Sequence, residues 1–133
     1  MRTETKQYDT TGKTFVDLTD EARAFSRGTG DGLLHVFAPH ATAGIALIET
    51  GSGSEEDLSA TIDRLLPRDQ GYVHGHGSPG HGRDHVLPAF ISPSLVVPVV
   101  EGDIALGTWQ SIVLVDTNVD NARRTVRFTF LEG

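Results

Sequence analysis

The chain has 133 residues, 38% of them hydrophobic, and carries eleven lysines and arginines against eighteen aspartates and glutamates, a formal net charge of −7. This negative balance argues against nucleic-acid binding, which needs a basic surface, and against adhesion to anionic membranes. The absence of cysteine excludes disulfides, thiolate metal ligands and thiol nucleophiles.

The first part of the chain is typical of strands around one short helix. Residues 1–6 lack the apolar segment of an export signal, and no apolar run reaches transmembrane length, so we expect a cytoplasmic protein. Two extended segments are predicted within residues 4–18, separated by the turn-forming residues 10–13. A helix is predicted from Thr19 to Gly28. Strands are predicted at 33–38 and 43–48.

The clearest helix is predicted to begin at Ser54. The Ser54 hydroxyl precedes the Asp57 carboxylate by three residues, close to the capping-box pattern. The stripe of apolar residues that follows has helical spacing and consists of Leu58, Ile62, Leu65 and Leu66. Pro67 is predicted to end this helix.

Residues 67–84 are too long and too rich in glycine for a plain connection, and loops of this length are usually functional. Gly82 and Pro88 argue against a regular helix that starts before His85. Strands are predicted at 94–100, 103–106, 110–116 and 124–131, the last with clear alternation of apolar residues. Together these elements predict one α+β domain over residues 1–133, mostly antiparallel strands with two or three short helices.

Histidines are concentrated in one part of the chain, because four of the six fall between positions 74 and 85. Neutral imidazole is the commonest protein ligand for zinc and similar ions, and without cysteine such a site must use histidines and carboxylates. A loop rich in histidine and glycine can equally be a solvated surface segment, so composition alone leaves both interpretations open. The six are His35, His40, His74, His76, His81 and His85.

The positions of the histidines distinguish them further. His81 and His85 have the i, i+4 spacing that brings two imidazoles together on a helix, but the predicted loop weakens this signal. His35 lies in the middle of a strand among apolar residues and is expected to be packed and hydrogen-bonded. His40 ends a strand in a tight link, which is a better place for a ligand.

Other charged residues have two interpretations each. Glu49 ends the strand after His40, so it can reach the same site as a base or as the partner of a ligand. Asp57 is either a site residue or a first-turn residue favoured by the helix dipole. Arg123 and Arg124, the one local basic pair, can bind a phosphate or carboxylate or form a surface salt bridge.

Several segments carry a resemblance to a known family. Residues 94–99 read Ser-Leu-Val-Val-Pro-Val, Glu101-Gly102 follows, and residues 106–114 read Leu-Gly-Thr-Trp-Gln-Ser-Ile-Val-Leu. The match continues in order and spacing at His40-Ala41-Thr42-Ala43, Glu49, Asp57, Tyr72-x-His74, His85 and Arg123-Arg124. Over almost its whole length the chain resembles the YjbQ-type family, also labelled secondary thiamine-phosphate synthase.

This resemblance implies a fold, an assembly and a site. The fold is α+β with a β-sandwich core, and the assembly is a homotrimer. Three recurring histidines correspond to His40, His74 and His85, around a divalent metal ion near the subunit boundary, for which we expect zinc. The remaining recurrent polar positions are assigned to catalysis, at Glu49 and Asp57, and to substrate binding, at Thr42, Arg123 and Arg124.

The sequence departs from the family pattern at three places. The link after Glu49 is one residue shorter, Arg83 stands where a histidine is frequent, and Pro88 stands where a helix-forming residue is common. None of these affects the three histidines. We therefore expect a differently shaped loop around the site, with an effect on substrate preference.

The activity implied by the family is formation of thiamine phosphate from a pyrimidine diphosphate and a thiazole phosphate. That reaction needs a cation for the leaving diphosphate and basic groups for the phosphates, although three histidines are unusual for magnesium-dependent diphosphate chemistry. A metal-dependent hydrolase or lyase acting on a small phosphorylated or carboxylated molecule fits the residues equally well. The alternative from another class is a non-catalytic trimer that binds a metabolite or anion and uses the metal as a structural element.

Overall fold

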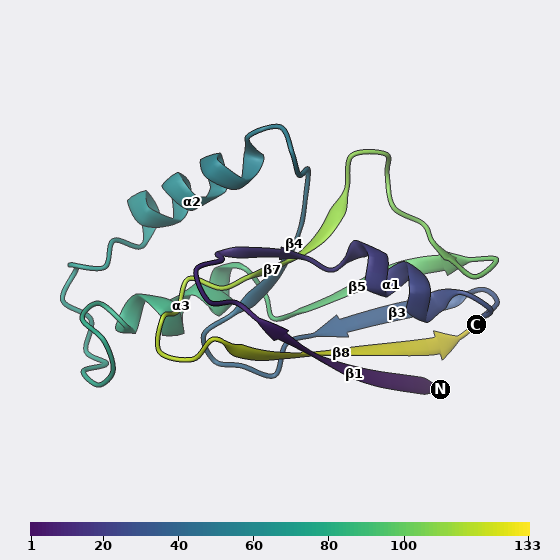
Figure 1. Ribbon diagram of the computed structural model, residues 1–133, viewed down its shortest axis with the longest axis horizontal. Helices are drawn as coiled ribbons and strands as arrows, with labels where there is room; N and C mark the ends of the chain where they lie inside the picture. The colour runs from purple at the N-terminus through teal and green to yellow at the C-terminus, as the bar shows by residue number, and fades with distance from the viewer.

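The computed structural model describes all 133 residues, and its elements follow the predicted order except for a third helix over Gly82–Phe90, which the sequence did not predict (Figure 1). The strands are β1 (Arg2–Asp9), β2 (Phe15–Asp17), β3 (Gly32–Phe37), β4 (Gly44–Ile48), β5 (Ser94–Val100), β6 (Asp103–Ile104), β7 (Ser111–Val115) and β8 (Arg123–Glu132). The helices are α1 (Thr19–Ser26), α2 (Ser54–Leu65) and α3 (Gly82–Phe90).

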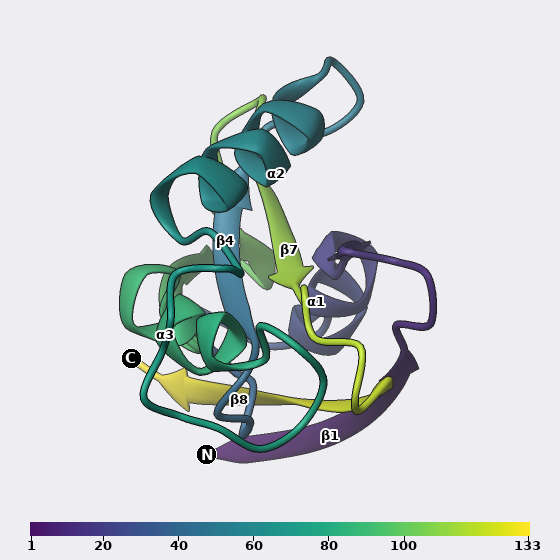
Figure 2. The ribbon, with the colours of Figure 1, turned by 90° about the vertical axis from the view of Figure 1, so that its left-hand side faces the viewer.

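The strands form two antiparallel sheets. The larger sheet has five strands in the order β1-β8-β3-β5-β6, and the smaller has three in the order β2-β7-β4. Figure 2 shows β4 and β7 of the smaller sheet running steeply across the direction of β1 and β8. The predicted α+β fold is confirmed.

The main core lies between the two sheets and under α1. Alternate residues of β8, namely Val126, Phe128 and Phe130, point into it, as their spacing predicts. They meet Ile112 and Leu114 from β7 of the other sheet. Burying a side chain the size of Phe128 contributes about 1.5–3 kcal/mol.

A second, smaller core covers the outer face of the smaller sheet. Ile62 of α2 and Leu87 of α3 pack with Val115 of β7, so these two helices form a layer over that face. Leu65, predicted to share the apolar stripe of α2, is 67% exposed. No helix in the structure combines the length and the apolar character needed to cross a bilayer.

The start of α2 differs in detail from the prediction. Gly53, with a φ of 98°, occupies the N-cap position, and the Ser54 side chain makes no capping hydrogen bond. Instead, the Glu55 carboxylate accepts the backbone N–H of Gly51 at 3.1 Å. The predicted Ser54 cap is therefore wrong, because the N-cap lies one residue earlier, at Gly53, whose left-handed backbone suits glycine, and Ser54 is the first residue of the helix.

Candidate metal centre

Helix α3 brings two histidines together. His81 directly precedes the helix, His85 follows one turn later, and their Nε2 atoms are 2.9 Å apart. The prediction that no helix starts before His85 is wrong, since α3 begins at Gly82 and contains Pro88. Proline removes one helical hydrogen bond, but the neighbouring Leu87 is completely buried and its packing stabilises this turn.

The loop before α3 contributes a third imidazole, that of His74. Its ring centroid lies 4.1 Å from that of His85 and 5.3 Å from that of His81. One ligand nitrogen from each of these three residues, here called the histidine cluster, lies within 4.8 Å of the others. The Nδ1 atom of His74 is buried without a hydrogen-bond partner, a state that costs about 1–3 kcal/mol unless something binds the atom.

Burial and mutual proximity keep two cluster residues neutral. Burial is the largest cause that lowers the pKa of His74 below its ordinary value of 6.5, followed by the charges of His76 and His81. Burial also lowers the pKa of His85, with smaller contributions from the neighbouring histidines. Neutral imidazole is the form that binds metal ions, so both residues are ready ligands at pH 7.

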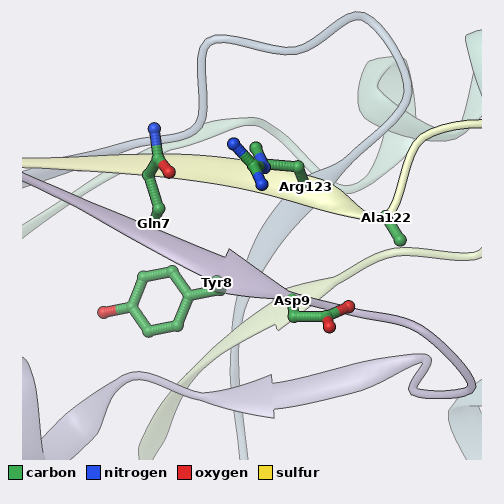
Figure 3. A pocket seen from close by; sticks show the side chains of 5 residues that line it. All are labelled: Gln7, Tyr8, Asp9, Ala122 and Arg123. Carbon is green, nitrogen blue, oxygen red and sulfur yellow. The ribbon is translucent and has the colours of Figure 1, made fainter.

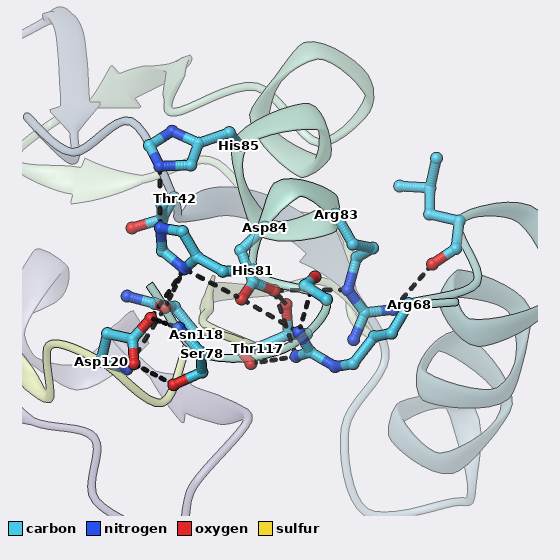
Figure 4. Close-up of polar contacts among 12 residues, drawn as sticks. Thr42, Arg68, Ser78, His81, Arg83, Asp84, His85, Thr117, Asn118 and Asp120 are labelled. Atoms are coloured by element: carbon cyan, nitrogen blue, oxygen red, sulfur yellow. Dashed lines mark hydrogen bonds and ion pairs between the residues drawn. The ribbon is translucent and has the colours of Figure 1, made fainter. Parts of the chain in front are cut away.

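A buried carboxylate, that of Asp84, stabilises the first turn of α3 (Figure 4). It accepts two hydrogen bonds from Arg68, at 3.1 and 3.2 Å, and one from Thr117 Oγ1 at 2.6 Å. Arg68 also donates to the backbone carbonyl of Thr117 at 2.6 Å. These contacts join the segment after α2, the start of α3 and the β7–β8 loop, and so stabilise the backbone that carries His81 and His85.

A hollow of about 340 Å³ opens beside the cluster. Thirteen residues between positions 68 and 82 form its wall, including His74, His76 and His81. Arg68 is the only arginine or lysine among them. A small molecule therefore has room next to the imidazoles and meets one positive side chain there.

Gly82 allows α3 to approach the loop that carries His74. A methyl group at Gly82 would lie 2.5 Å from Cβ of Tyr72 and 3.3 Å from the carbonyl oxygen of His74. We therefore expect Gly82→Ala to lower the free energy of unfolding by about 1–3 kcal/mol in urea titrations. Gly75→Ala is the control, because its nearest neighbour is at 3.8 Å, and equal stability of the two variants would contradict this packing.

His40 is not part of the histidine cluster of the single chain. Its Nε2 accepts the backbone N–H of Thr125 at 2.8 Å, which occupies a lone pair that a metal ion would need. Of the three histidines implied by the family resemblance, the chain thus brings together His74 and His85, and His81 is the third member of its cluster. The i, i+4 spacing from His81 to His85 was the sequence signal for this residue.

The two carboxylates assigned to catalysis do not belong to the cluster. Glu49 follows the end of β4 and is partly buried, whereas Asp57 lies exposed in the first turn of α2. Neither contributes to the group of side chains that could hold a metal ion in this chain. Their assignment to catalysis stays a prediction.

The two neighbouring arginines lie in opposite environments. Arg124 is buried and donates to both carboxylate oxygens of Asp116, at 2.6 and 2.8 Å, and to Thr42 Oγ1 at 2.8 Å. Thr42 is buried with it.

Arg123, by contrast, is exposed beside Asp9, at a hollow of about 420 Å³ that β1 and the start of β8 line (Figure 3). Among the residues assigned to substrate binding, only Arg123 faces solvent in the single chain. The substrate-binding assignments of Thr42, Arg123 and Arg124 also stay predictions.

Comparison with known proteins decides the family. The family model for UPF0047 protein YjbQ-like matches residues 3–133. The chain belongs to the YjbQ/UPF0047 family. UPF0047 protein Rv2556c of Mycobacterium tuberculosis is 61% identical over 133 residues, 100% of both chains. A UPF0047 protein of Archaeoglobus fulgidus is 32% identical over 111 residues, covering 84% of this chain and 86% of that protein.

Solved structures of other proteins share the fold of this chain. A YbjQ-like protein of unknown function from Sulfolobus solfataricus superposes with a TM-score of 0.91 at 25% identity, covering 99% of this chain and 97% of that chain. Hypothetical protein APE1520 from Aeropyrum pernix superposes with a TM-score of 0.89 at 29% identity, covering 100% of both. The resemblance inferred from the Gly-Thr-Trp-Gln segment and its context is confirmed.

Proposed function

We propose that this YjbQ/UPF0047 protein binds one divalent transition-metal ion per chain, preferably zinc, at His74, His81 and His85. Three neutral imidazoles suit zinc, whose bonds to nitrogen are about 2.0–2.1 Å long. The observation that carries the proposal is the buried, unpartnered Nδ1 of His74, in a ring 4.1 Å from that of His85. A bound ion would hold the three rings together and bind the ring nitrogen atoms that face one another.

The surroundings of the cluster support a catalytic use of such an ion. Three protein ligands leave a coordination position to water or to a substrate oxygen, and the bound ion would supply Lewis acidity there. The hollow of about 340 Å³ and the charge of Arg68 favour a small phosphorylated or carboxylated substrate. His76, exposed with its ring 3.9 Å from that of His74, is placed to accept or donate a proton.

Within this proposal, formation of thiamine phosphate is a side activity. Arg68 is the arginine that a phosphate group in the hollow can reach, because its side chain lines the hollow and is 35% exposed even though it is paired with Asp84, whereas Arg124 is buried against Asp116. We expect slow formation of thiamine phosphate from the pyrimidine diphosphate and the thiazole phosphate, measured by chromatography, and loss of it in His85→Ala. Hydrolase or lyase activity that depends on the metal would instead be detected as turnover in a screen of phosphorylated metabolites.

We further propose that the protein assembles as a homotrimer. The outer face of the five-stranded sheet carries apolar side chains on neighbouring strands, with Leu33 45%, Val96 53% and Leu131 53% exposed. An apolar face of this kind favours association with another chain. Sedimentation equilibrium should give three times the chain mass of 14.3 kDa, and Leu33→Glu should dissociate the assembly. A monomeric wild-type protein would contradict the proposal.

Elemental analysis of protein purified without chelator tests the metal site. We expect about one equivalent of zinc per chain, lost in His74→Ala and in His85→Ala with an unchanged circular dichroism spectrum. His35→Ala is the control, because His35 contacts Ser94 Oγ at 2.6 Å on the five-stranded sheet, outside the cluster. If the wild-type protein takes up no zinc even after incubation with it, the proposal is wrong.

The second candidate is a non-catalytic binding module with a structural ion. His74 lies on a loop, and an ion bound by His74, His81 and His85 would fix that loop against α3. This arrangement favours a structural ion. In that case, zinc at about 100 times its dissociation constant should raise the free energy of unfolding by about 2.7 kcal/mol, and no substrate should turn over. Metal-dependent turnover of a substrate would favour the enzyme and contradict the non-catalytic module.

The pH dependence of the metal-free protein is a separate prediction. The pKa of His74 and that of His85 are lower in the folded chain than the ordinary value of 6.5, so the unfolded chain binds protons more readily. The stability that these neutral rings contribute is present above pH 6.5 and is lost as the pH falls through their folded pKa values. We expect melting temperatures to fall between pH 7 and pH 5, and to fall less in His74→Gln.

A further inference from the structure

The side of the His81 ring that faces away from the cluster is hydrogen-bonded to the β7–β8 loop (Figure 4). Nδ1 lies 2.9 Å from Asp120 Oδ2 and 3.1 Å from Asn118 Oδ1, while Nε2 points to His85. We propose that Asp120 is a positioning residue that holds the proton of His81 on Nδ1 and so directs the lone pair of Nε2 into the cluster. This inference rests on the proposed metal site.

Both neighbours of Nδ1 are acceptors, which determines the position of the proton. Asn118 Oδ1 also accepts the backbone N–H of Asp120 at 3.3 Å, so its oxygen, and not its amide nitrogen, faces this region. A carboxylate cannot donate, so the hydrogen of the neutral ring must lie on Nδ1. The tautomer with a free Nε2 is the one that a metal ion at the cluster requires.

Asp120, and not Asp84, is the carboxylate that acts on this ring. Asp84 Oδ2 is 3.9 Å from Nδ1, beyond hydrogen-bond distance, and its oxygens already accept bonds from Arg68 and Thr117. The carboxylate of Asp120 is oriented by Ser78, whose backbone N–H donates at 3.1 Å and whose hydroxyl donates to the other oxygen.

The same carboxylate connects the two segments that supply the cluster. Ser78 belongs to the loop that carries His74, and His81 precedes α3. Close packing supports this connection, because a methyl group at Gly77 would lie 2.7 Å from Cγ of His81 and 2.9 Å from Asp120 Oδ2. Asp120 therefore orients His81 and also keeps the His74 loop against the helix.

The test compares Asp120→Ala with Asp120→Asn. Cobalt(II) titration followed by absorbance should show a 10- to 100-fold weaker affinity in Asp120→Ala. Asp120→Asn retains an acceptor oxygen and should recover much of that loss. Long-range ¹H–¹⁵N spectra of the metal-free protein should show His81 protonated on Nδ1 in the wild type and in Asp120→Asn, and a mixture of tautomers in Asp120→Ala. Glu56→Ala, which removes an exposed carboxylate from α2, is the control.

The outcomes separate this inference from the metal site itself. Wild-type cobalt affinity and an unchanged His81 tautomer in Asp120→Ala would overturn it. Weaker binding with an unchanged tautomer would also overturn it, because Asp120 would then act only on the loop. If the wild-type protein binds no metal but the tautomer changes in Asp120→Ala, the proposed function fails while the positioning contact stands.

Discussion

His81→Ala is expected to lower the affinity for zinc by at least about 100-fold, whereas His40→Ala leaves it within about twofold of the wild type. Loss of a direct ligand exceeds the 10- to 100-fold effect typical of groups that only support a ligand. His40 instead accepts the backbone N–H of Thr125, so its removal leaves the cluster of the single chain intact. Competition titrations with a chromophoric zinc chelator measure both affinities.

The same pair of variants distinguishes the cluster from the family arrangement. If His40 of a neighbouring subunit completes the site with His74 and His85, His40→Ala loses the metal and His81→Ala keeps it. Loss in both variants would indicate four ligands shared between subunits. Loss in neither would contradict both three-histidine arrangements.

The second large effect is expected at the buried ion pair of β8. Arg124→Ala leaves the carboxylate of Asp116, itself 3% exposed, without its positive partner inside the protein. Breaking a buried pair from one side costs about 3–5 kcal/mol of folding free energy. Urea unfolding at fixed protein concentration should therefore show a large loss for Arg124→Ala and a change within about 0.5 kcal/mol for the exposed neighbour, Arg123→Ala.

Arg124→Lys is included because Arg124→Ala can fail to fold. Lysine keeps the charge but cannot donate to both oxygens of Asp116, so an intermediate loss is expected. Equal stability of the variants at 123 and 124 would contradict the burial of Arg124. The comparison also separates binding from folding, because a substrate-binding role for Arg123 would reduce activity without reducing stability.

The structure explains one departure from the family pattern. Arg83, which stands where a histidine is frequent, is buried and donates to the carbonyl of Leu66 at 3.1 Å and to Asp63 at 3.1 Å. It therefore connects α3 to the end of α2.

Local patterns in the sequence were sufficient to predict the order of the elements other than α3, and to predict which face of a sheet individual strand residues point to. Strand β8 shows this most clearly, because the alternation of Val126, Phe128 and Phe130 is a property of neighbouring residues. The same alternation places Arg124 inward and Arg123 outward. Treating the two as one basic pair missed this distinction, although the sequence contained it.

Only the tertiary structure decided which histidines meet. His81 joins the cluster because α3 begins at Gly82, and that start depends on packing against Tyr72, ten residues away, and on the burial of Leu87. The Nε2 atom of His40 already accepts a hydrogen bond from the backbone of Thr125, on a strand 85 residues later in the chain. Periodicity in the sequence describes only residues a few positions apart, whereas the distances between remote side chains depend on how the sheets and helices pack. The sequence by itself therefore determined the fold class and the number of histidines near the site, but not which of these histidines lie together.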